Sequence, residues 1–226
     1  MRKVYIHHHL GLGDHIICNG LVRRIAENYD EVYIFCKQHN YPSVAFLYAY
    51  DPKFKVIPLA NENDVNNYPA DQVIKIGFAE LGKIMERTGC TWDRGFYEQF
   101  NVPIAERWSN FYVKRDEYRE DQLFIKLTKP NTPYALIHAN GSDNVNRINE
   151  DHISPDLQRI YISPEHTDII FDYGVLIENA NEIHCVDSSF KHLADSLPTN
   201  GKLFYHDKKY KRSAYPHLQL KEWIEV

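Results

Sequence analysis

Short runs of β-branched and aromatic residues alternate along the first third of the chain with segments of helical periodicity. Residues 3–7 (KVYIH) form the first run, and after a glycine-rich loop Ile17, Leu21 and Ile25 fall four positions apart, which is typical of one helix face. Further runs predict strands at 31–36, 54–59 and 72–77 and a helix at 41–50. Strands that alternate with helices predict a parallel sheet covered on both faces.

The second half of the chain begins the same pattern again. Residues 127–133 (LTKPNTP) contain two prolines and turn-forming residues and are typical of a linker. After them the pattern predicts strands at 134–138, 182–187 and 202–206 and helices at 168–180 and 188–197. We therefore expect two α/β domains, 1–126 and 127–226, with the functional site in a cleft between them.

The middle of the chain is polar and aromatic, and residues 92–113 predict helical pieces broken at Pro103. Composition adds that 43% of the 226 residues are hydrophobic and 25% are charged, which predicts a packed globular core. No apolar run is long enough to span a bilayer and the N-terminus lacks a signal-peptide pattern, so we expect a cytoplasmic protein without a transmembrane segment. The net charge of −5 argues against a nucleic-acid partner, and four scattered cysteines without a CxxC pair indicate reduced thiols.

The loop after the first strand, HHHLGLGDHIICNGLVRR (7–24), raises three chemical possibilities. A dinucleotide fingerprint is weak, because Ile16 stands at its third glycine and no acid ends the second strand. The glycine-lysine-serine/threonine ending of a P-loop is missing. Histidines 7–9 are consecutive on a strand, where neighbours point to opposite faces, so the sequence predicts no metal site.

The remaining feature of this loop is Asp14, which follows Gly11 and Gly13 where the chain enters a helix. One interpretation is a helix cap that complements the helix dipole. The other is a catalytic base that faces the cleft, because a carboxylate here would repel a phosphate.

The second half offers an anion site instead. Asp187 ends a predicted strand, and Ser188 and Ser189 begin a helix whose free N–H groups favour a diphosphate. His192 lies one turn later on the same face. A serine cap beside an ordinary core histidine is the alternative.

Two motifs together resemble a known family. GLGD (11–14) and DSSFKHLADSL (187–197), each at a strand-to-helix junction, are similar to the GT-B glycosyltransferases, especially the heptosyltransferase-like family (glycosyltransferase family 9) of bacterial glycan synthesis. The resemblance implies a GT-B-like α/β fold, with two Rossmann-like parallel-sheet domains facing a cleft. It makes 1–126 the acceptor-side domain and 127–226 the nucleotide-sugar donor domain.

Carried onto this sequence, the family pattern gives each motif a role. Asp14 becomes the base that takes a proton from the acceptor hydroxyl. The donor-binding residues become Gly11, Gly13, Ser142, Arg147, Asp187, Ser188, Ser189 and His192, of which Ser142 and Arg147 are assigned from their place in the polar loop after the fifth strand. The chain departs from the family in its shorter length, in a serine at 189 where glycine is commoner, and in the HLAD ending of its second motif.

The resulting hypothesis is a metal-independent, inverting transfer of a sugar from a nucleotide-diphosphate donor to a glycan or small hydroxyl acceptor, without a further cofactor. Trp92, Arg94 and Tyr97 are candidate acceptor contacts, with core packing as the alternative for their rings. Two other classes stay open: a nucleotide-sugar epimerase of the same architecture, and a non-catalytic nucleotide-sugar or glycan-binding protein in which Asp14 is only a cap.

Overall fold

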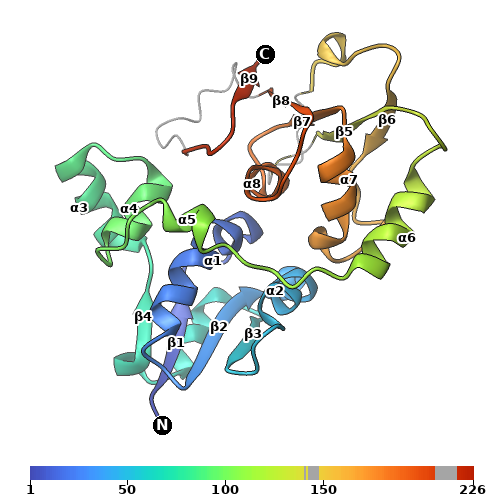
Figure 1. Ribbon diagram of the computed structural model, residues 1–226. Helices are drawn as coiled ribbons and strands as arrows, with labels where there is room; N and C mark the ends of the chain where they lie inside the picture. The colour runs from blue at the N-terminus through green and yellow to red at the C-terminus, as the bar shows by residue number, and fades with distance from the viewer. Residues whose placement is uncertain (140, 142–147, 207–217) are drawn as a thin grey trace. The chain divides into compact units, whose positions relative to one another are not determined.

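The computed structural model describes residues 1–139, 141, 148–206 and 218–226 (Figure 1). They form two compact units. The first contains Met1–Lys114 and Leu218, and the second begins at Arg115 and holds the other described residues. The second unit therefore includes residues 115–126, which lie in the first of the two domains expected from the sequence.

The first unit is built on a four-stranded sheet in the order β3-β2-β1-β4, and all its strand pairs are parallel. The strands are β1 (Lys3–His7), β2 (Glu31–Lys37), β3 (Phe54–Leu59) and β4 (Val73–Lys75). The α-helices are α1 (Leu12–Ala26), α2 (Tyr41–Tyr48), α3 (Phe78–Thr88), α4 (Trp92–Glu98) and α5 (Glu106–Ser109), and three short 3-10 helices are η1 (Gln38–Asn40), η2 (Glu62–Asn67) and η3 (Ala70–Gln72). The predicted strand and helix order of this unit is confirmed.

The second unit has a five-stranded parallel sheet in the order β6-β5-β7-β8-β9. Its strands are β5 (Tyr134–His138), β6 (Gln158–Tyr161), β7 (Glu182–Cys185), β8 (Lys202–Tyr205) and β9 (Trp223–Glu225). Its helices are α6 (Glu117–Leu127), η4 (Glu150–His152), η5 (Ile170–Tyr173), α7 (Gly174–Asn179) and α8 (Ser189–Ser196). The expected α/β class with two parallel sheets is confirmed.

One predicted element of the second unit differs from the structure. In place of a single helix over 168–180, the chain forms the 3-10 helix η5 and then α7, which begins at Gly174. A side chain at position 174 would overlap the carboxylate of Glu120 on α6. The glycine therefore lets α7 start directly against α6, which a periodicity argument does not reveal.

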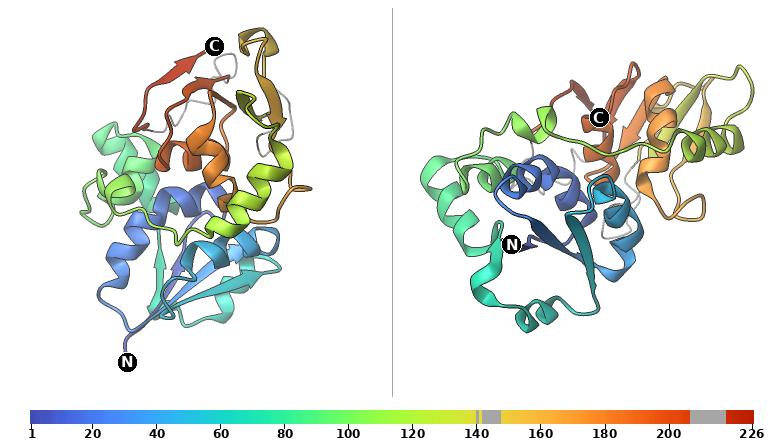
Figure 2. Two further views of the ribbon diagram at one scale, coloured as in Figure 1. Left: turned by 45° about the vertical axis from the view of Figure 1, so that its right-hand side comes forward. Right: turned by 60° about the horizontal axis from the view of Figure 1, so that its bottom comes forward.

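Helix α6 is joined to α7 by a buried carboxylate. Glu120 is almost fully buried, accepts the backbone N–H of Val175 at 2.9 Å and pairs with Arg115. The Arg115 guanidinium also reaches Glu178 at 2.8 Å. Burial raises the pKa of Glu120, while Arg115 acts in the opposite direction. These contacts attach α6, green in Figure 2, to the second unit.

The core strands are buried on both faces, as parallel sheets require. Every residue of β7 is buried, as are four of the five residues of β5. In an open parallel sheet, ligands bind beside the carboxyl ends of the strands, where the strand-to-helix loops gather. The β1–α1 and β7–α8 junctions both lie at such edges. No helix of the described residues is long and apolar enough to cross a bilayer.

Helix α1 lies close to α5 at Gly20. A Cβ at this position would overlap the carbonyl oxygen of Glu106 in α5 and lie 3.3 Å from the Tyr97 hydroxyl. This oxygen belongs to the backbone of α5, so it can move aside only if the helix itself moves. Gly20 thus sets the contact distance between α1 and α5.

We expect Gly20→Ala to lower the free energy of unfolding of the first unit by about 1–2 kcal/mol, because a forced overlap in a packed interior costs on the order of 1–3 kcal/mol and helix propensity offsets part of it. Gly82→Ala in α3 is the matched control, since a Cβ there meets no atom within 4 Å. This control should raise stability by about 0.5–1 kcal/mol. Chemical denaturation measures both, and equal effects of the two variants would contradict the close approach.

Candidate active site

The β1–α1 turn places the Asp14 carboxylate directly against Gly11. A Cβ added at position 11 would lie 2.6 Å from Asp14 Oδ2. Gly11 has φ −70° and ψ 146°, which any residue adopts, so this glycine is not required by its backbone conformation. Its lack of a side chain instead leaves room for the Asp14 carboxylate, which a Cβ at this position would displace. Asp14 is half-buried in the first turn of α1, where the helix dipole favours its charge.

Gly11 and Gly13 act differently in this turn. Gly11 precedes α1, and its carbonyl accepts the N–H of His15 at 3.1 Å, which begins the helix. Gly13 is already the second residue of α1. Gly11, Gly13 and Asp14 thus lie in one turn at the carboxyl end of β1.

A pocket of about 300 Å³ adjoins this turn, and the sequence analysis did not identify it. It lies where β1, β2 and β3 end, and it is lined by Leu10, Lys37, Gln38, His39, Leu59, Ala60 and Glu62. The two leucines are buried and form an apolar floor, while the charged and amide side chains are exposed at the rim. An apolar floor with donors and acceptors of both charges suits one face of a sugar ring and its hydroxyls.

Three histidines beside the turn are buried in neutral form. Burial lowers the pKa of His8 to about 3, lowers that of His15 well below its usual value, and lowers that of His7. The rings of His8 and His15 are in edge contact, with centroids 4.2 Å apart. Within the described residues, no three His, Cys, Asp or Glu side chains are grouped to hold a metal ion.

The three candidate acceptor contacts lie on α4. Trp92 is half-buried, and its ring packs 4.9 Å from that of His9, next to the β1–α1 turn. Arg94 is exposed and its guanidinium is 2.7 Å from Glu98. Tyr97 is fully buried, and its hydroxyl donates a hydrogen bond to the Ile17 carbonyl at 2.8 Å. It therefore packs against α1 and stabilises this helix.

The β7–α8 junction of the second unit brings the other motif together. Ser188 is the N-cap of α8: its hydroxyl accepts the Lys191 N–H at 3.4 Å and donates to the Val186 carbonyl at 3.2 Å. Asp187 and Ser189 are half-buried beside it. His192 is buried one turn into the helix, with Nε2 4.0 Å from Asp187 Oδ1. The junction therefore presents a hydroxyl, a carboxylate and an imidazole around the first turn of one helix.

Asp195, in the last turn of α8, attaches this helix to the rest of the second unit. Its buried carboxylate accepts the backbone N–H groups of Leu220 at 3.0 Å and Lys221 at 3.1 Å, and the indole N–H of Trp223 at 3.1 Å. These bonds fix the helix to β9. Sequence reasoning did not find this role, although Asp195 is the acid of the HLAD ending.

Ser142 and Arg147, the candidate diphosphate contacts, lie outside the described residues. The other predicted donor residues fall into two groups. Gly11 and Gly13 belong to the first unit, and the residues of the β7–α8 junction belong to the second.

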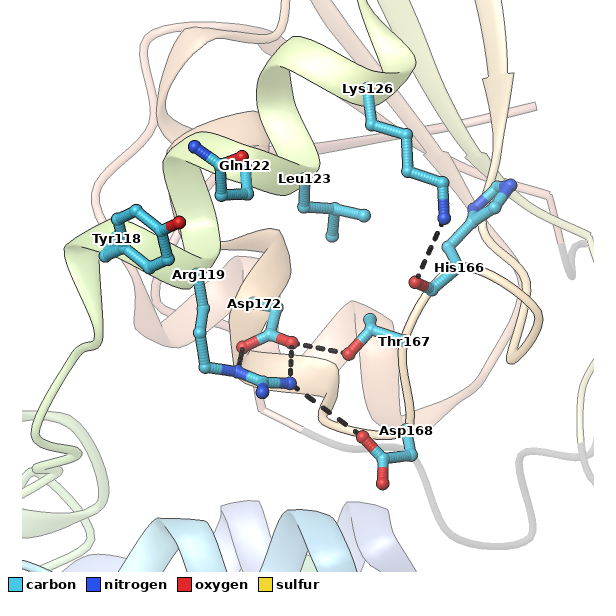
Figure 3. Close-up of a pocket in the computed structure, with 9 residues that line it drawn as sticks. All are labelled: Tyr118, Arg119, Gln122, Leu123, Lys126, His166, Thr167, Asp168 and Asp172. Atoms are coloured by element: carbon cyan, nitrogen blue, oxygen red, sulfur yellow. Dashed lines mark hydrogen bonds and ion pairs between the residues drawn. The ribbon is translucent and has the colours of Figure 1, made fainter.

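A larger pocket, of about 420 Å³, lies between α6 and the segment that follows β6 (Figure 3). Its base is an ion pair in which Arg119 binds both oxygens of the buried Asp172, at 3.0 and 2.7 Å, and Thr167 donates its hydroxyl to the same carboxylate. Tyr118 and Lys126 stand on its sides. None of the predicted site residues that the structure describes lines this pocket.

Comparison with known proteins supports the fold at low sequence identity. No family model matches the chain, and no curated protein matches it in sequence. The crystal structure of the glycosyl transferase family 9 protein from Veillonella parvula DSM 2008 is similar over 99% of this chain and 87% of its own, with a TM-score of 0.55 and 7% identity.

Two further solved structures are similar. The iron-containing dodecameric glycosyltransferase TibC from enterotoxigenic E. coli H10407 matches over 90% of this chain and 58% of its own, with a TM-score of 0.55 and 13% identity. The E. coli ADP-heptose LPS heptosyltransferase II matches over 91% and 84%, with a TM-score of 0.48 and 10% identity. The first two likenesses confirm the expected resemblance in fold.

Gly11→Ala tests the contact between the turn and Asp14. We expect the variant to fold, because alanine adopts the observed backbone angles, and to move the Asp14 carboxylate away from the turn. The carbon-13 resonance of the Asp14 carboxyl should shift, while the free energy of unfolding changes by less than about 1 kcal/mol. An unchanged Asp14 resonance would contradict the geometry.

Proposed function

We propose that this protein is a glycosyltransferase that moves a sugar from a nucleotide-diphosphate donor to a hydroxyl of a glycan or small-molecule acceptor. The observation that carries the proposal is the placement of its two motifs. Each lies at the carboxyl edge of a parallel sheet, in a fold similar to that of two glycosyltransferase structures, one of them of family 9. A carboxylate stands at one junction and a capped helix N-terminus at the other.

In the proposed reaction the acceptor oxygen bonds to the anomeric carbon of the donor sugar while the bond from that carbon to the diphosphate oxygen breaks. The diphosphate leaves with the electron pair, and Asp14 takes the proton of the attacking hydroxyl. Attack opposite the leaving group inverts the anomeric centre. A carboxylate is a weak base, which is sufficient when the proton leaves late in a transition state of oxocarbenium character.

The β7–α8 junction is proposed to hold the diphosphate. The first N–H groups of an α-helix have no partner within the helix, and the positive end of the dipole favours an anion. The Ser188 hydroxyl and the His192 imidazole can turn toward phosphate oxygens. The Asp187 carboxylate can accept a hydrogen bond from a hydroxyl group of the donor sugar. Charge that grows on the leaving diphosphate is then stabilised by fixed groups, and the proposal needs no metal ion.

The pocket beside Leu10 is proposed as the acceptor subsite. It lies at the ends of three neighbouring strands, and its lining includes Leu10, which directly precedes the turn from Gly11 to Asp14. The buried leucine floor would contact the apolar face of one sugar residue. Lys37, His39 and Glu62 at the rim would then select among its polar substituents.

A thermal-shift series against nucleoside diphosphates and nucleotide sugars, without added metal, tests the donor half of the proposal. A ligand at about 100 times its dissociation constant should add about 2.7 kcal/mol of stability, which corresponds to several degrees in Tm for a chain of this size. The shift should vanish in the Ser188→Ala, His192→Ala double variant. Lys126→Ala, in the pocket of Figure 3, is the matched control and should keep the shift.

Other results of the same series would redirect the assignment. No shift with any nucleotide would contradict a nucleotide-sugar donor and favour a glycan-binding protein. A shift that survives in the double variant but is lost in Lys126→Ala would move the nucleotide site to the pocket between α6 and the segment after β6.

A further inference from the structure

Leu10, at the entrance to the Asp14 turn, has a backbone conformation that its residue type disfavours. Its φ is 57°, in the left-handed region that glycine and asparagine adopt more readily. Its side chain is fully buried against Phe35, Leu59 and Val65. A glycine would relieve the backbone but would remove this side chain from the core and from the floor of the acceptor pocket. The protein therefore keeps the leucine, and other groups must stabilise its conformation.

Two side chains bind the backbone of Leu10, one at its N–H and one at its carbonyl. Its N–H donates to His8 Nδ1 at 3.3 Å, and its carbonyl accepts from Asn40 Nδ2 at 3.1 Å. Asn40 comes from η1, after β2, so the turn is tied to a neighbouring strand-end loop. The next residue is also held, because the Gly11 N–H donates to the His9 carbonyl at 2.8 Å.

We infer that His8 and Asn40 are positioning residues, which hold Leu10 in its left-handed conformation and thereby fix the place of the Asp14 carboxylate. Only a few residues connect Leu10 to the Asp14 carboxylate. Leu10 sets the direction of Gly11, Gly11 accepts the first hydrogen bond of α1, and Asp14 lies against Gly11 in the first turn. The catalytic consequence rests on the proposed function, whereas the clamp on the turn does not.

The chemistry of His8 supports a specific role for its Nδ1 atom. The ring is fully buried, and Nε2 has no hydrogen-bond partner among the described residues. Burying an imidazole in this way costs stability that a phenylalanine ring would not lose. Since Nδ1 accepts from Leu10, the ring proton is on Nε2, and burial keeps the ring neutral, so this acceptor persists through the neutral pH range.

Substitutions that separate ring volume from hydrogen bonding test the inference. His8→Phe keeps the ring and removes the acceptor. His8→Asn restores it, because asparagine side chains accept the backbone N–H two residues on. Asn40→Asp keeps the shape but removes the donor to the Leu10 carbonyl. His15→Phe is the matched control, since His15 is equally buried and its two nitrogens have no hydrogen-bond partner in the described part of the chain.

Two measurements need no substrate. In folded His8→Phe and Asn40→Asp, amide hydrogen exchange of Leu10 and Gly11 should rise about tenfold, as expected for the loss of one hydrogen bond. The carbon-13 resonance of the Asp14 carboxyl should shift. His8→Asn and His15→Phe should keep wild-type values for both. Unchanged exchange and an unchanged Asp14 resonance in His8→Phe would overturn the clamp.

Kinetics of sugar transfer then test the positioning role. In His8→Phe, kcat should fall by tenfold to about 100-fold, because a small displacement of a catalytic group lowers the rate by a factor of this size. The KM for the donor should change by less than about twofold, and His8→Asn should recover most of kcat. Equal kcat in His8→Phe and wild type, with the turn loosened, would overturn the catalytic role. If the wild-type protein transfers no sugar, the proposed function fails, while exchange and the Asp14 resonance still decide the clamp.

Discussion

The contact between the Asp14 carboxylate and the backbone of Gly11 is the constraint on which the account of this protein depends. A carboxylate at a helix N-terminus is common and is usually a cap or a dipole partner. Here the turn has no side chain at position 11, so the carboxylate can lie against the chain at the end of β1, beside a pocket with an apolar floor. The parallel sheet determines this location, because the ends of β1, β2 and β3 meet at one edge.

The second unit follows the same structural rule, with a different set of groups at its helix N-terminus. At the end of β7 the chain turns into α8, and the cap is a neutral serine hydroxyl, so the dipole of the helix remains available to an anion. Asp195 ties the far part of α8 to the segment around β9 through three hydrogen bonds. The two junctions thus divide the proposed chemistry: a proton acceptor belongs to one unit and an anion site to the other.

Much of the fold could be predicted from the sequence, because strands buried on both faces have continuous apolar runs and α1 has a clear four-residue period. Strand β6 (QRIY) was missed, since only Ile160 in it is buried. Pairing of β9 at the end of the sheet was missed as well, because its two last residues are exposed and it spans three residues. Both are edge strands, for which hydrophobic periodicity carries little signal.

The candidate site was predictable only where a motif marks it. Asp14 and Ser188 stand in recognisable strand-to-helix junctions. Lys37 ends β2, and Asn40 and Glu62 lie in the short 3-10 helices η1 and η2 that come after β2 and β3. For these three residues the only available signal was that parallel strands end at one edge. The left-handed conformation of Leu10 had no signal at all, because leucine is not a residue that indicates it.

The most direct test of the central claim is the rate at which nucleoside diphosphate is released from the donor that the protein binds, with and without a mixture of bacterial oligosaccharide acceptors, in wild type and Asp14→Asn. The account predicts release that requires an acceptor, and a loss of about 100-fold or more in the variant, within the usual range for a general base, while donor binding is kept. Full turnover in Asp14→Asn would contradict it. Conversion of the donor into an isomeric nucleotide sugar without any acceptor would contradict it too, and would assign the protein to the epimerases.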